Sequence, residues 1–366
     1  MPTKCAYIHV PFCLSKCKYC SFVSFNKLEL KKAYVFSLLK EIDYYYQNEE
    51  LNTIYFGGGT PSLLTIDELK KILKKLNFDE TTEITIEVNP NDISAEYLKE
   101  LKNIGFNRLS IGSQTFKDDI LNLIGRRHNS DEIINTVKLA KEAGFNNISL
   151  DLIYGLPTQK IQDFKKDIDT LLSLGVQHIS MYGLKIEEGC SFYKSPPQNL
   201  PDDDMQADMY LLAISETTKN GFSHYEISNF AKEGFESKHN LNYWSENPYY
   251  GFGVAAHGFV DGVRYSNYCT IEEYIDNPTS HEFGAFITEK EKLEETIFLG
   301  LRKSQGINIK EINNTYNINF DDKYKNTISK YLETGHLKKT DNGYKLSDNK
   351  QTNGFLVSNI ILSEFI

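Results

Sequence analysis

The stretch Tyr7-Ile-His-Val-Pro-Phe-Cys-Leu-Ser-Lys-Cys-Lys-Tyr-Cys-Ser-Phe22 places three cysteines, Cys13, Cys17 and Cys20, close together near the start of the chain. Three thiolates at the spacing CxxxCxxC can hold three irons of a [4Fe–4S] cluster, and the fourth iron is then open to an outside ligand. The preceding residues 6–10 have the pattern of a short apolar strand. The sequence therefore predicts a strand that leads directly into a metal-binding loop.

The spacing of the cysteines leaves two other interpretations open. A structural zinc site usually takes two pairs of cysteines, or cysteine with histidine, and the chain has no second pair. Cysteines at positions i, i+4 and i+7 can also lie on one buried face of a helix. Pro11 and the flanking Lys16 and Lys18 favour a charged, metal-binding loop over both.

Short apolar strands alternate with amphipathic helices as far as about residue 225, which is typical of a parallel sheet with crossover helices. Gly105, Gly144 and Gly175 each follow an expected helix and precede a strand, as C′ glycines do. Six such units predict a partial or full barrel of the α/β class. The expected strands are 6–10, 53–56, 83–88, 108–111, 148–153 and 178–182, and the expected helices are 30–46, 67–76, 95–104, 131–143 and 163–174.

The pattern changes after the barrel. Residues 1–228 are expected to form the barrel, residues 229–285 an irregular connecting region, and residues 286–366 a small winged-helix-like α+β domain. Aromatic residues in the connecting region are too dense for a disordered linker. The expectation for the last domain rests on helices over 289–302, 309–316 and 322–333 and on a hairpin over 336–347 that turns at Asn342-Gly343.

Composition excludes some classes of partner and location. Forty basic against fifty acidic residues give a net charge of −10, which argues against binding nucleic acid or an anionic membrane by bulk attraction. No run of about 18 apolar residues and no signal-peptide core is present, so we expect no integral membrane segment, at most a transient membrane contact, and a cytoplasmic location. Six cysteines, three of them clustered, are typical of a reducing compartment with a metal site.

The opening Tyr-Ile-His-Val-Pro-Phe-Cys-x3-Cys-x2-Cys resembles that of the radical S-adenosylmethionine (SAM) proteins, in particular the branch with the anaerobic coproporphyrinogen dehydrogenases and the HemW haem chaperones. The resemblance runs through most of the chain. It implies a TIM-like partial barrel, a [4Fe–4S] cluster on Cys13, Cys17 and Cys20, and exchangeable SAM at the open iron. With an electron from an external donor, such a cluster can cleave SAM to a 5′-deoxyadenosyl radical.

Residues beside several strand ends match the SAM-binding positions of this branch. A glycine-rich turn or a buried acid at a strand end is weak evidence alone, but a series of matches in the right order argues against coincidence. Side-chain carboxylates can accept hydrogen bonds from the ribose hydroxyls or the amino group of SAM, and an arginine can pair with its carboxylate. The turn Phe56-Gly-Gly-Gly-Thr-Pro61 is expected to offer free backbone N–H groups to the ligand. By the resemblance, the SAM-binding residues are Tyr7, Gly58, Gly59, Thr60, Glu87, Gln114, Arg126 and Asp151.

A second motif points to haem. Lys238-His-Asn-Leu-Asn-Tyr-Trp244 matches the HNxxYW signature of the HemW family and contains the only tryptophan of the chain. Imidazole is a common axial ligand of haem iron, and aromatic rings offer apolar surface to the macrocycle. We therefore expect His239 to bind the iron and Tyr243 and Trp244 to contact the haem, in a pocket between the barrel and the aromatic region. The alternative iron ligands are His257, Cys190 and Cys269.

The resemblance implies two candidate functions. The dehydrogenases carry a fourth cysteine two residues after the third, where this chain has Phe22, and this favours a chaperone that passes haem to an acceptor protein and has no catalytic residue. The alternative is oxygen-independent oxidation of coproporphyrinogen III, a radical SAM reaction of porphyrin biosynthesis. Nucleic-acid modification or binding, suggested by the winged-helix-like tail, is disfavoured by the acidic balance. The expected partners are haem, its acceptor and an electron donor.

Overall fold

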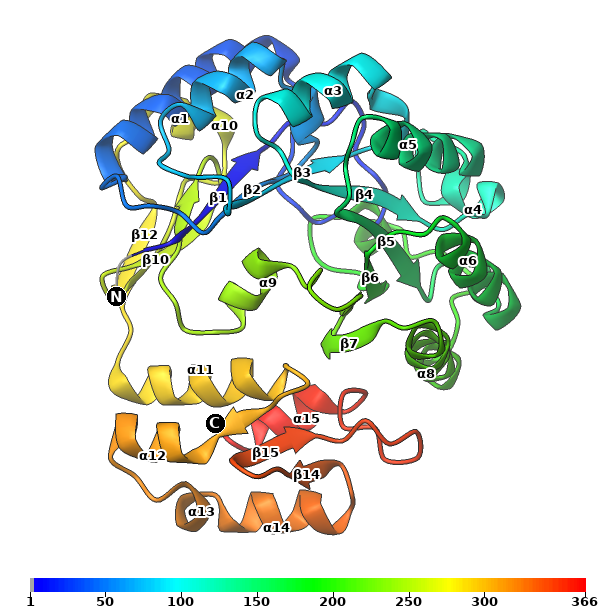
Figure 1. Ribbon diagram of the computed structural model, residues 1–366, viewed down its shortest axis with the longest axis vertical. Coiled ribbons are helices and arrows are strands. Elements are labelled where there is room, and N and C mark those ends of the chain that lie inside the picture. Colours follow the sequence, from blue (N-terminus) through cyan, green and yellow to red (C-terminus); the bar gives the residue numbers. More distant parts are fainter. Residues whose placement is uncertain (1–2) are drawn as a thin grey trace. The chain divides into compact units, whose positions relative to one another are not determined.

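The computed structural model describes residues 3–366, which divide into two compact units. The larger unit contains the chain as far as Ala213 together with Pro248–Phe286, and the smaller unit contains Ile214–Asn247 together with Ile287–Ile366. The chain therefore leaves the larger unit, enters the smaller one and returns (Figure 1). The sequence led us to expect three successive domains, whereas residues 229–285 are shared between the two units.

A curved parallel sheet forms the centre of the larger unit (Figure 1). Its strands follow the order β6-β5-β4-β3-β2-β1-β9, and every pairing in this row is parallel. The row does not close on itself, so the partial barrel is confirmed and the full barrel is wrong. The strands are β1 (Cys5–Val10), β2 (Thr53–Gly58), β3 (Glu83–Val88), β4 (Arg108–Gln114), β5 (Ile148–Tyr154), β6 (His178–Gly183) and β9 (Tyr250–Phe252).

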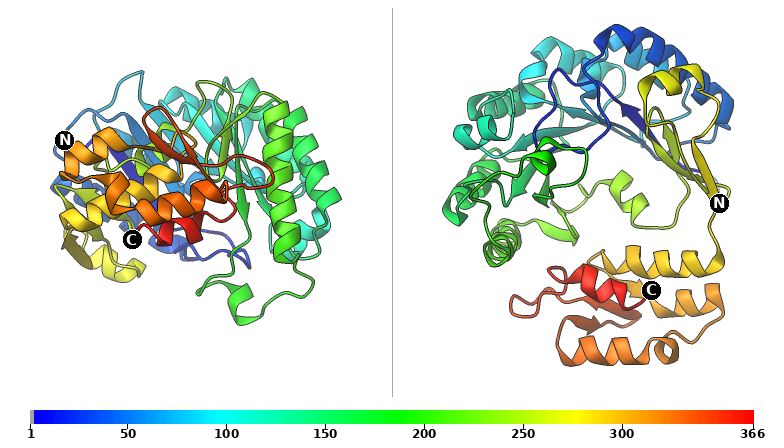
Figure 2. Two further views of the ribbon diagram at one scale, coloured as in Figure 1. Left: turned by 90° about the horizontal axis from the view of Figure 1, so that it is seen from below. Right: turned by 180° about the vertical axis from the view of Figure 1, so that it is seen from behind.

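Helices cover the outer side of this sheet (Figures 1 and 2). The five expected crossover helices are confirmed within a few residues, and the glycines after three of them, Gly105, Gly144 and Gly175, have positive φ. The helix α4 was not expected. The helices are α1 (Lys31–Tyr45), α2 (Ile66–Leu73), α3 (Ala95–Asn103), α4 (Asp118–Leu123), α5 (Ser130–Glu142), α6 (Ile161–Ser173) and α7 (Ser191–Lys194), and the short 3-10 turns are Leu28–Leu30, Pro61–Leu63 and Pro90–Asp92.

Side chains alternate between the two faces of the sheet. Ile8, Phe56 and Ile86 are fully buried among apolar residues, which is the pattern of a sheet face covered by helices. The residues next to Ile8 and Ile86 in their strands include Tyr7 and Glu87, and these polar side chains lie on the opposite, inner face. A closed barrel of this class fills its interior with branched aliphatic residues, whereas this open sheet lines its inner face with groups that can bind a ligand.

The region after β9 is more regular than expected. Strands β10 (His257–Val260), β11 (Val263–Ser266) and β12 (Phe283–Phe286) form an antiparallel sheet, and α10 (Ile271–Asp276) lies between the last two. The expectation of an irregular region was wrong here, because strands of four residues are too short to show a period. The turn between β10 and β11 did carry a signal, since Asp261 and Gly262 both have positive φ, as in a type I′ hairpin.

The smaller unit contains a hairpin, a three-stranded antiparallel sheet and several helices. A hairpin of β7 (Ser223–Glu226) and β8 (Asn229–Ala231) precedes helix α9 (Lys238–Tyr243). The expected helices and hairpin of the C-terminal region are confirmed, except that the helix expected over 322–333 is divided at Tyr324. The remaining elements are α11 (Glu289–Leu301), β13 (Ile307–Asn308), α12 (Ile309–Tyr316), α13 (Phe320–Lys323), α14 (Lys325–Glu333), β14 (Leu337–Lys339), β15 (Gly343–Leu346) and α15 (Ser358–Ser363), while α8 (Asp203–Lys219) contains the boundary between the units.

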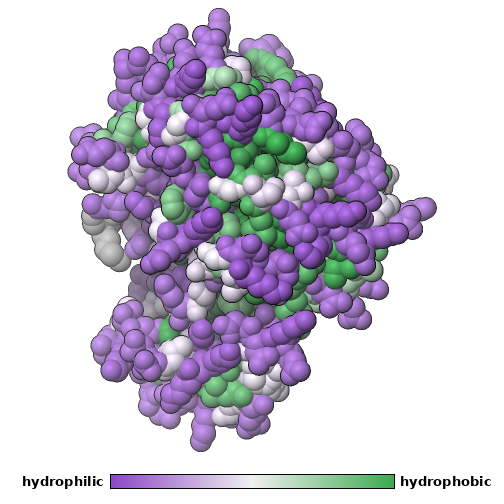
Figure 3. Space-filling view, turned by 45° about the vertical axis from the view of Figure 1, so that its right-hand side comes forward, coloured by the Kyte–Doolittle hydropathy of each residue, from purple (hydrophilic) through white to green (hydrophobic). Residues whose placement is uncertain are grey.

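The surface agrees with the acidic, polar composition. The face shown in Figure 3 is mostly hydrophilic, with apolar residues gathered in smaller patches. Over residues 3–366, none of the helices is both long enough and apolar enough to cross a lipid bilayer.

A buried carboxyl group joins three segments of the larger unit. Glu41 of α1 accepts hydrogen bonds from the backbone N–H of Gly253 (2.8 Å), the amide of Asn267 (2.6 Å) and the hydroxyl of Tyr274 (2.5 Å). Burial raises the pKa of Glu41 from 4.5 to about 7, although these donors act in the other direction. The carboxyl group therefore holds the returning segment 248–286 against α1.

This raised pKa predicts a pH dependence of stability. The folded protein binds the Glu41 proton more tightly than the unfolded chain, so the free energy of unfolding falls as the pH rises from about 4.5 to about 7. Replacing Glu41 with Gln removes a contribution of about 3 kcal/mol to that fall. Urea unfolding at pH 5 and pH 8 measures the difference, with Glu100→Gln on the exposed face of α3 as control. An unchanged difference between the two pH values in Glu41→Gln would contradict the assignment.

Candidate functional site

The cysteine loop begins where β1 ends and is tied to the sheet at its base. The carbonyl of Pro11 accepts from the N–H of Phe25 (2.6 Å), and the N–H of Cys13 donates to the carbonyl of Phe25 (3.1 Å). In its middle, the N–H of Lys18 donates to the carbonyl of Ile124 (3.0 Å) after α4. These bonds close the loop at both ends and hold it over the carboxyl ends of the strands.

The three thiols of this loop are free and partly exposed. The sulfur of Cys13 lies 3.6 Å from the Thr60 hydroxyl, and the guanidinium of Arg126 donates to the sulfur of Cys17 at 3.6 Å. Burial raises the pKa of Cys20 to about 11. Within residues 3–366, no three side chains of His, Cys, Asp or Glu already converge on a point where they could hold a metal ion. The thiols must therefore turn toward one another to hold a cluster.

The chemistry of the surroundings fits an anionic metal cluster. Thiolates are the ligands of [4Fe–4S] clusters, and the guanidinium of Arg126 places a permanent positive charge against one of the three thiols. Its Nε is buried and has no partner in the described part of the chain. Lys16 and Lys18 are exposed on the same loop. A cation with unused hydrogen-bonding capacity is a suitable neighbour for bound anionic groups.

The glycine-rich turn after β2 holds the end of β1. The N–H of Gly59 donates to the carbonyl of Val10 (2.8 Å), and the N–H of Thr60 donates to the carbonyl of Phe12 (2.7 Å). The N–H of Gly58 donates to Glu87 (3.2 Å). The expectation that these three N–H groups are free for a ligand was therefore wrong, because the turn uses them to fix the cysteine loop and an acidic side chain.

Close packing explains the glycines in this turn. A Cβ on Gly59 would lie 2.6 Å from the carbonyl oxygen of Phe12, and a Cβ on Gly58, whose φ is +109°, would lie 2.6 Å from the ring of His9. Real Cβ atoms do not approach other atoms so closely. The turn therefore requires glycine at both positions for its contact with β1.

Tyr7 belongs to a buried chain of hydrogen bonds that sequence reasoning missed. The Nε2–H of His9 donates to the carbonyl of Val23 (2.8 Å), so its Nδ1 accepts from the Tyr7 hydroxyl (3.0 Å). Burial lowers the pKa of His9 to about 4, so the ring is neutral near pH 7. The alternation Tyr-Ile-His in β1 was the available signal, since it places His9 and Tyr7 on the same face of the sheet.

Two acidic side chains lie on the inner face of the sheet. Glu87 accepts from the Tyr55 hydroxyl (2.9 Å), and the Ser110 hydroxyl lies 3.4 Å from both oxygens of Asp151. Burial raises the pKa of Glu87 to about 7 and that of Asp151 to about 6, while the positive charge of Arg108 acts in the opposite direction on both. Each carboxyl group is therefore held by hydroxyl donors and is close to titration at neutral pH.

Arg126 and Gln114 meet near the carboxyl end of β4. Arg126 donates to the Asn89 side chain (2.8 Å) and to the carbonyl of Gly112 (2.6 Å), and the Asn89 amide donates to the Thr60 hydroxyl (2.9 Å). Gln114 is nine-tenths buried with φ +67°, and a Cβ on Gly112 would lie 3.0 Å from its amide nitrogen. Asn89 was not singled out from the sequence, although it follows Glu87 closely in Glu-Val-Asn-Pro.

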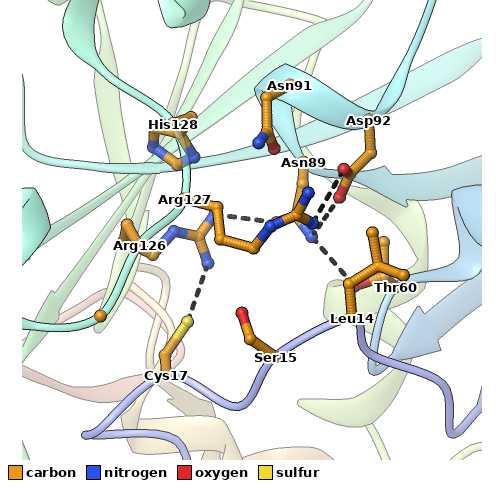
Figure 4. A pocket seen from close by; sticks show the side chains of 11 residues that line it. Leu14, Ser15, Cys17, Thr60, Asn89, Asn91, Asp92, Arg126, Arg127 and His128 are labelled. Atoms are coloured by element: carbon orange, nitrogen blue, oxygen red, sulfur yellow. Dashed lines mark hydrogen bonds and ion pairs between the residues drawn. The ribbon is translucent and has the colours of Figure 1, made fainter. Parts of the chain in front are cut away.

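A pocket opens between the cysteine loop and these residues (Figure 4). Arg127 donates to Asp92 (3.1 Å) beside it. The structure brings Cys17, Thr60 and Arg126 together at this pocket, whereas Glu87, Gln114 and Asp151 do not line it. The lining residues are Leu14, Ser15, Cys17, Thr60, Asn89, Asn91, Asp92, Gly125, Arg126, Arg127 and His128.

The second motif lies in the smaller unit, on α9. His239 is only 2% exposed, and its Nε2 shares a hydrogen bond with the Tyr243 hydroxyl (3.1 Å) one turn later. Trp244 ends the helix, and the guanidinium of Arg302 lies 5.6 Å from the centre of its ring. The motif is therefore assembled with the C-terminal domain, and its histidine already has a partner.

The other candidate iron ligands have different surroundings. Cys190 is buried in an apolar cluster with Ile124, Leu156 and Phe192, against which Tyr19 of the cysteine loop packs. Its position is explained by packing. His257 and Cys269 are exposed side chains of the larger unit.

Two family models match the chain. The radical SAM superfamily model matches residues 7–171, and the HemN C-terminal domain model matches residues 287–349. The heme chaperone HemW of Bacillus subtilis is 38% identical to this chain over 99% of both proteins. The chain belongs to the HemW haem chaperone family. The HemW protein of Lactococcus lactis is 37% identical over 94% of this chain and 95% of that protein.

A solved structure shares the fold. Coproporphyrinogen III oxidase (HemN) from Escherichia coli, described as a radical SAM enzyme, superposes with a TM-score of 0.87 over 99% of this chain and 90% of its own. The two sequences are 21% identical, so the likeness shows the fold alone. The α/β fold with a smaller C-terminal domain is therefore confirmed.

The tight contact at Gly59 gives a prediction about the cysteine loop. Gly59→Ala forces its Cβ against the carbonyl oxygens of Val10 and Phe12 and so separates the turn from β1. We expect a loss of about 2–4 kcal/mol of stability and lower retention of iron after anaerobic reconstitution. Gly284→Ala is the matched control, because its Cβ would meet only one atom, at 3.8 Å, and its φ is not positive. Equal stability and equal iron content in both variants would contradict this account of the turn.

Proposed function

We propose that this protein binds haem through His239 and transfers it to an acceptor protein, while a [4Fe–4S] cluster with SAM occupies the larger unit. The observation that supports the proposal most strongly is the complete HNxxYW signature on α9 in a chain of the HemW family. The signature brings an imidazole, a phenol and an indole to one short helix. Imidazole binds haem iron, and the aromatic rings suit the faces of the macrocycle.

The burial of His239 sets a condition for haem binding. Its Nε2 faces the Tyr243 hydroxyl, and the side chain has almost no exposed surface. An iron bound at Nε2 must replace this hydrogen bond, so Tyr243 has to move when haem arrives. Tyr243 is well placed to release the ligand again, because its hydroxyl can return to the imidazole when the haem leaves.

Cys13, Cys17 and Cys20 would hold the cluster, and Tyr7, Gly58, Gly59, Thr60, Glu87, Gln114, Arg126 and Asp151 would surround SAM. When bound, the cluster supplies an iron site for SAM and one-electron chemistry that depends on an external donor. The protein's own residues would orient the ligand and set the electrostatic charge of this site. Arg126 carries a cation beside Cys17, and Glu87 and Asp151 are acceptors for hydroxyl or amino groups of a ligand.

The cysteine loop supports the chaperone over the oxidation of coproporphyrinogen III. Phe22 occupies the position of the fourth cysteine of the dehydrogenases, and its side chain is 66% exposed. A phenyl ring supplies no ligand and no proton at this position. We therefore propose that the protein carries haem. Repeated turnover of coproporphyrinogen III in an anaerobic assay would contradict this function.

Haem binding by single variants tests the proposal. Stoichiometric anaerobic titration with haem, followed by absorption spectroscopy, should show binding by the wild type. His239→Ala should lose affinity by about tenfold or more, because it removes the iron ligand. His257→Ala, which removes an exposed histidine of the larger unit, should bind like the wild type. Unchanged binding by His239→Ala would contradict the role of this histidine, and loss of binding by His257→Ala would transfer that role to His257.

A further inference from the structure

Asn89 joins two of the side chains that are expected to surround SAM. Its amide nitrogen donates to the hydroxyl of Thr60 (2.9 Å), and its amide oxygen accepts from Nη2 of Arg126 (2.8 Å) (Figure 4). The Thr60 hydroxyl lies 3.6 Å from the sulfur of Cys13, and Nη1 of Arg126 donates to the sulfur of Cys17 at 3.6 Å. The asparagine therefore lies at the centre of a chain of polar contacts that runs from Cys13 to Cys17.

The backbone that carries Asn89 is itself held in place. Asn89 follows β3 directly and precedes the 3-10 turn Pro90–Asp92. The carbonyl of the buried Pro90 accepts from the hydroxyl of Thr136 on α5 (2.8 Å). The Asn89 amide is therefore presented from a fixed position between a strand and a helix, and a flexible side chain that binds to it takes its own position from it.

Arg126 depends on such a partner because its side chain is long and its pairing depends on direction. Its Nη2 has two acceptors, the oxygen of the Asn89 side chain and the carbonyl of Gly112 (2.6 Å). These two bonds fix the plane of the guanidinium, whose Nε is buried without a partner within residues 3–366. A planar fork of donors pairs well with a carboxylate only in a suitable orientation. SAM carries one carboxylate, at its methionyl end.

We propose that Asn89 is a positioning residue for SAM, which orients Arg126 for pairing with the carboxylate of the ligand. The inference rests on the proposed function and adds a residue outside the set that matches the SAM-binding positions of the family. Asn89 acts through the guanidinium and does not have to touch SAM. An amide suits this place, because an apolar side chain would give up both hydrogen bonds and a carboxylate would neutralise Arg126.

The test compares two ligands that differ only in that carboxylate. Equilibrium dialysis of the anaerobically reconstituted protein gives the dissociation constants of SAM and of decarboxylated SAM. In Asn89→Ala, that of SAM should rise by about tenfold or more, because the charge-assisted hydrogen bond that orients Arg126 is lost. That of decarboxylated SAM should stay within about threefold of the wild-type value, since this ligand has no carboxylate for Arg126 to pair with.

Two further variants complete the comparison. Asn122→Ala is the matched control, because Asn122 is an exposed residue of α4, four residues before Arg126, and its side chain takes no part in these hydrogen bonds. It should bind both ligands as the wild type does. Asn89→Asp keeps the shape of the side chain and covers the case in which Asn89→Ala does not fold. Its carboxylate competes with that of SAM for Arg126, so the loss of affinity should again be confined to SAM.

Equal weakening of both ligands by Asn89→Ala would overturn the inference, since a merely structural role predicts it. Wild-type affinity for SAM in Asn89→Ala, or in Asn89→Asp where the first variant does not fold, would overturn it as well. These outcomes leave the proposed function standing if Arg126→Ala loses affinity for SAM but not for decarboxylated SAM. Absence of SAM binding by the reconstituted wild type would contradict the proposed cofactor site itself.

Discussion

Two backbone hydrogen bonds join the glycine-rich turn to the first strand, and the functional end of the larger unit depends on them. They run from Gly59 to Val10 and from Thr60 to Phe12, directly before the cysteine loop begins. In the same turn, the N–H of Gly58 donates a hydrogen bond to the carboxyl group of Glu87, and the Thr60 hydroxyl lies near the sulfur of Cys13. The position of the thiols relative to the acidic inner face of the sheet is therefore set by the backbone, which a side-chain substitution elsewhere does not easily move.

Both units contain buried carboxyl groups, and in each unit hydrogen-bond donors surround them. In the larger unit, Glu87 and Asp151 lie among hydroxyl donors, and burial brings their pKa values close to neutrality. In the smaller unit, the buried Glu226 accepts hydrogen bonds from the side-chain amide of Asn229 and from the N–H of Ser228. Such groups are retained at a cost in stability, which is common where side chains serve a ligand. In the larger unit, the arrangement ties the proposed ligand site to a buried hydrogen-bond network.

The sequence predicted the strands and crossover helices of the larger unit well, because the period of apolar residues along the chain reflects which side of each element is buried. Strand β3 and helix α12 were expected with the bounds they have, and Gly105 ends its helix as anticipated. The use of the Gly58–Thr60 amides and the hydrogen bond from His9 to Val23 could not be predicted, because each joins residues that are distant in the chain. The strands between residues 257 and 286 were missed since they are too short to show a period, although Asp261-Gly262 marked their turn.

The central claim is that Cys13, Cys17 and Cys20 hold a [4Fe–4S] cluster whose fourth iron accepts SAM. The most direct measurement is the electron paramagnetic resonance spectrum of the anaerobically reconstituted, reduced protein before and after addition of SAM. The account predicts a reduced [4Fe–4S] signal whose g values change when SAM binds, because the ligand field of the open iron changes. A signal that SAM leaves unaltered, or a protein that holds zinc at these cysteines and no iron, would contradict it.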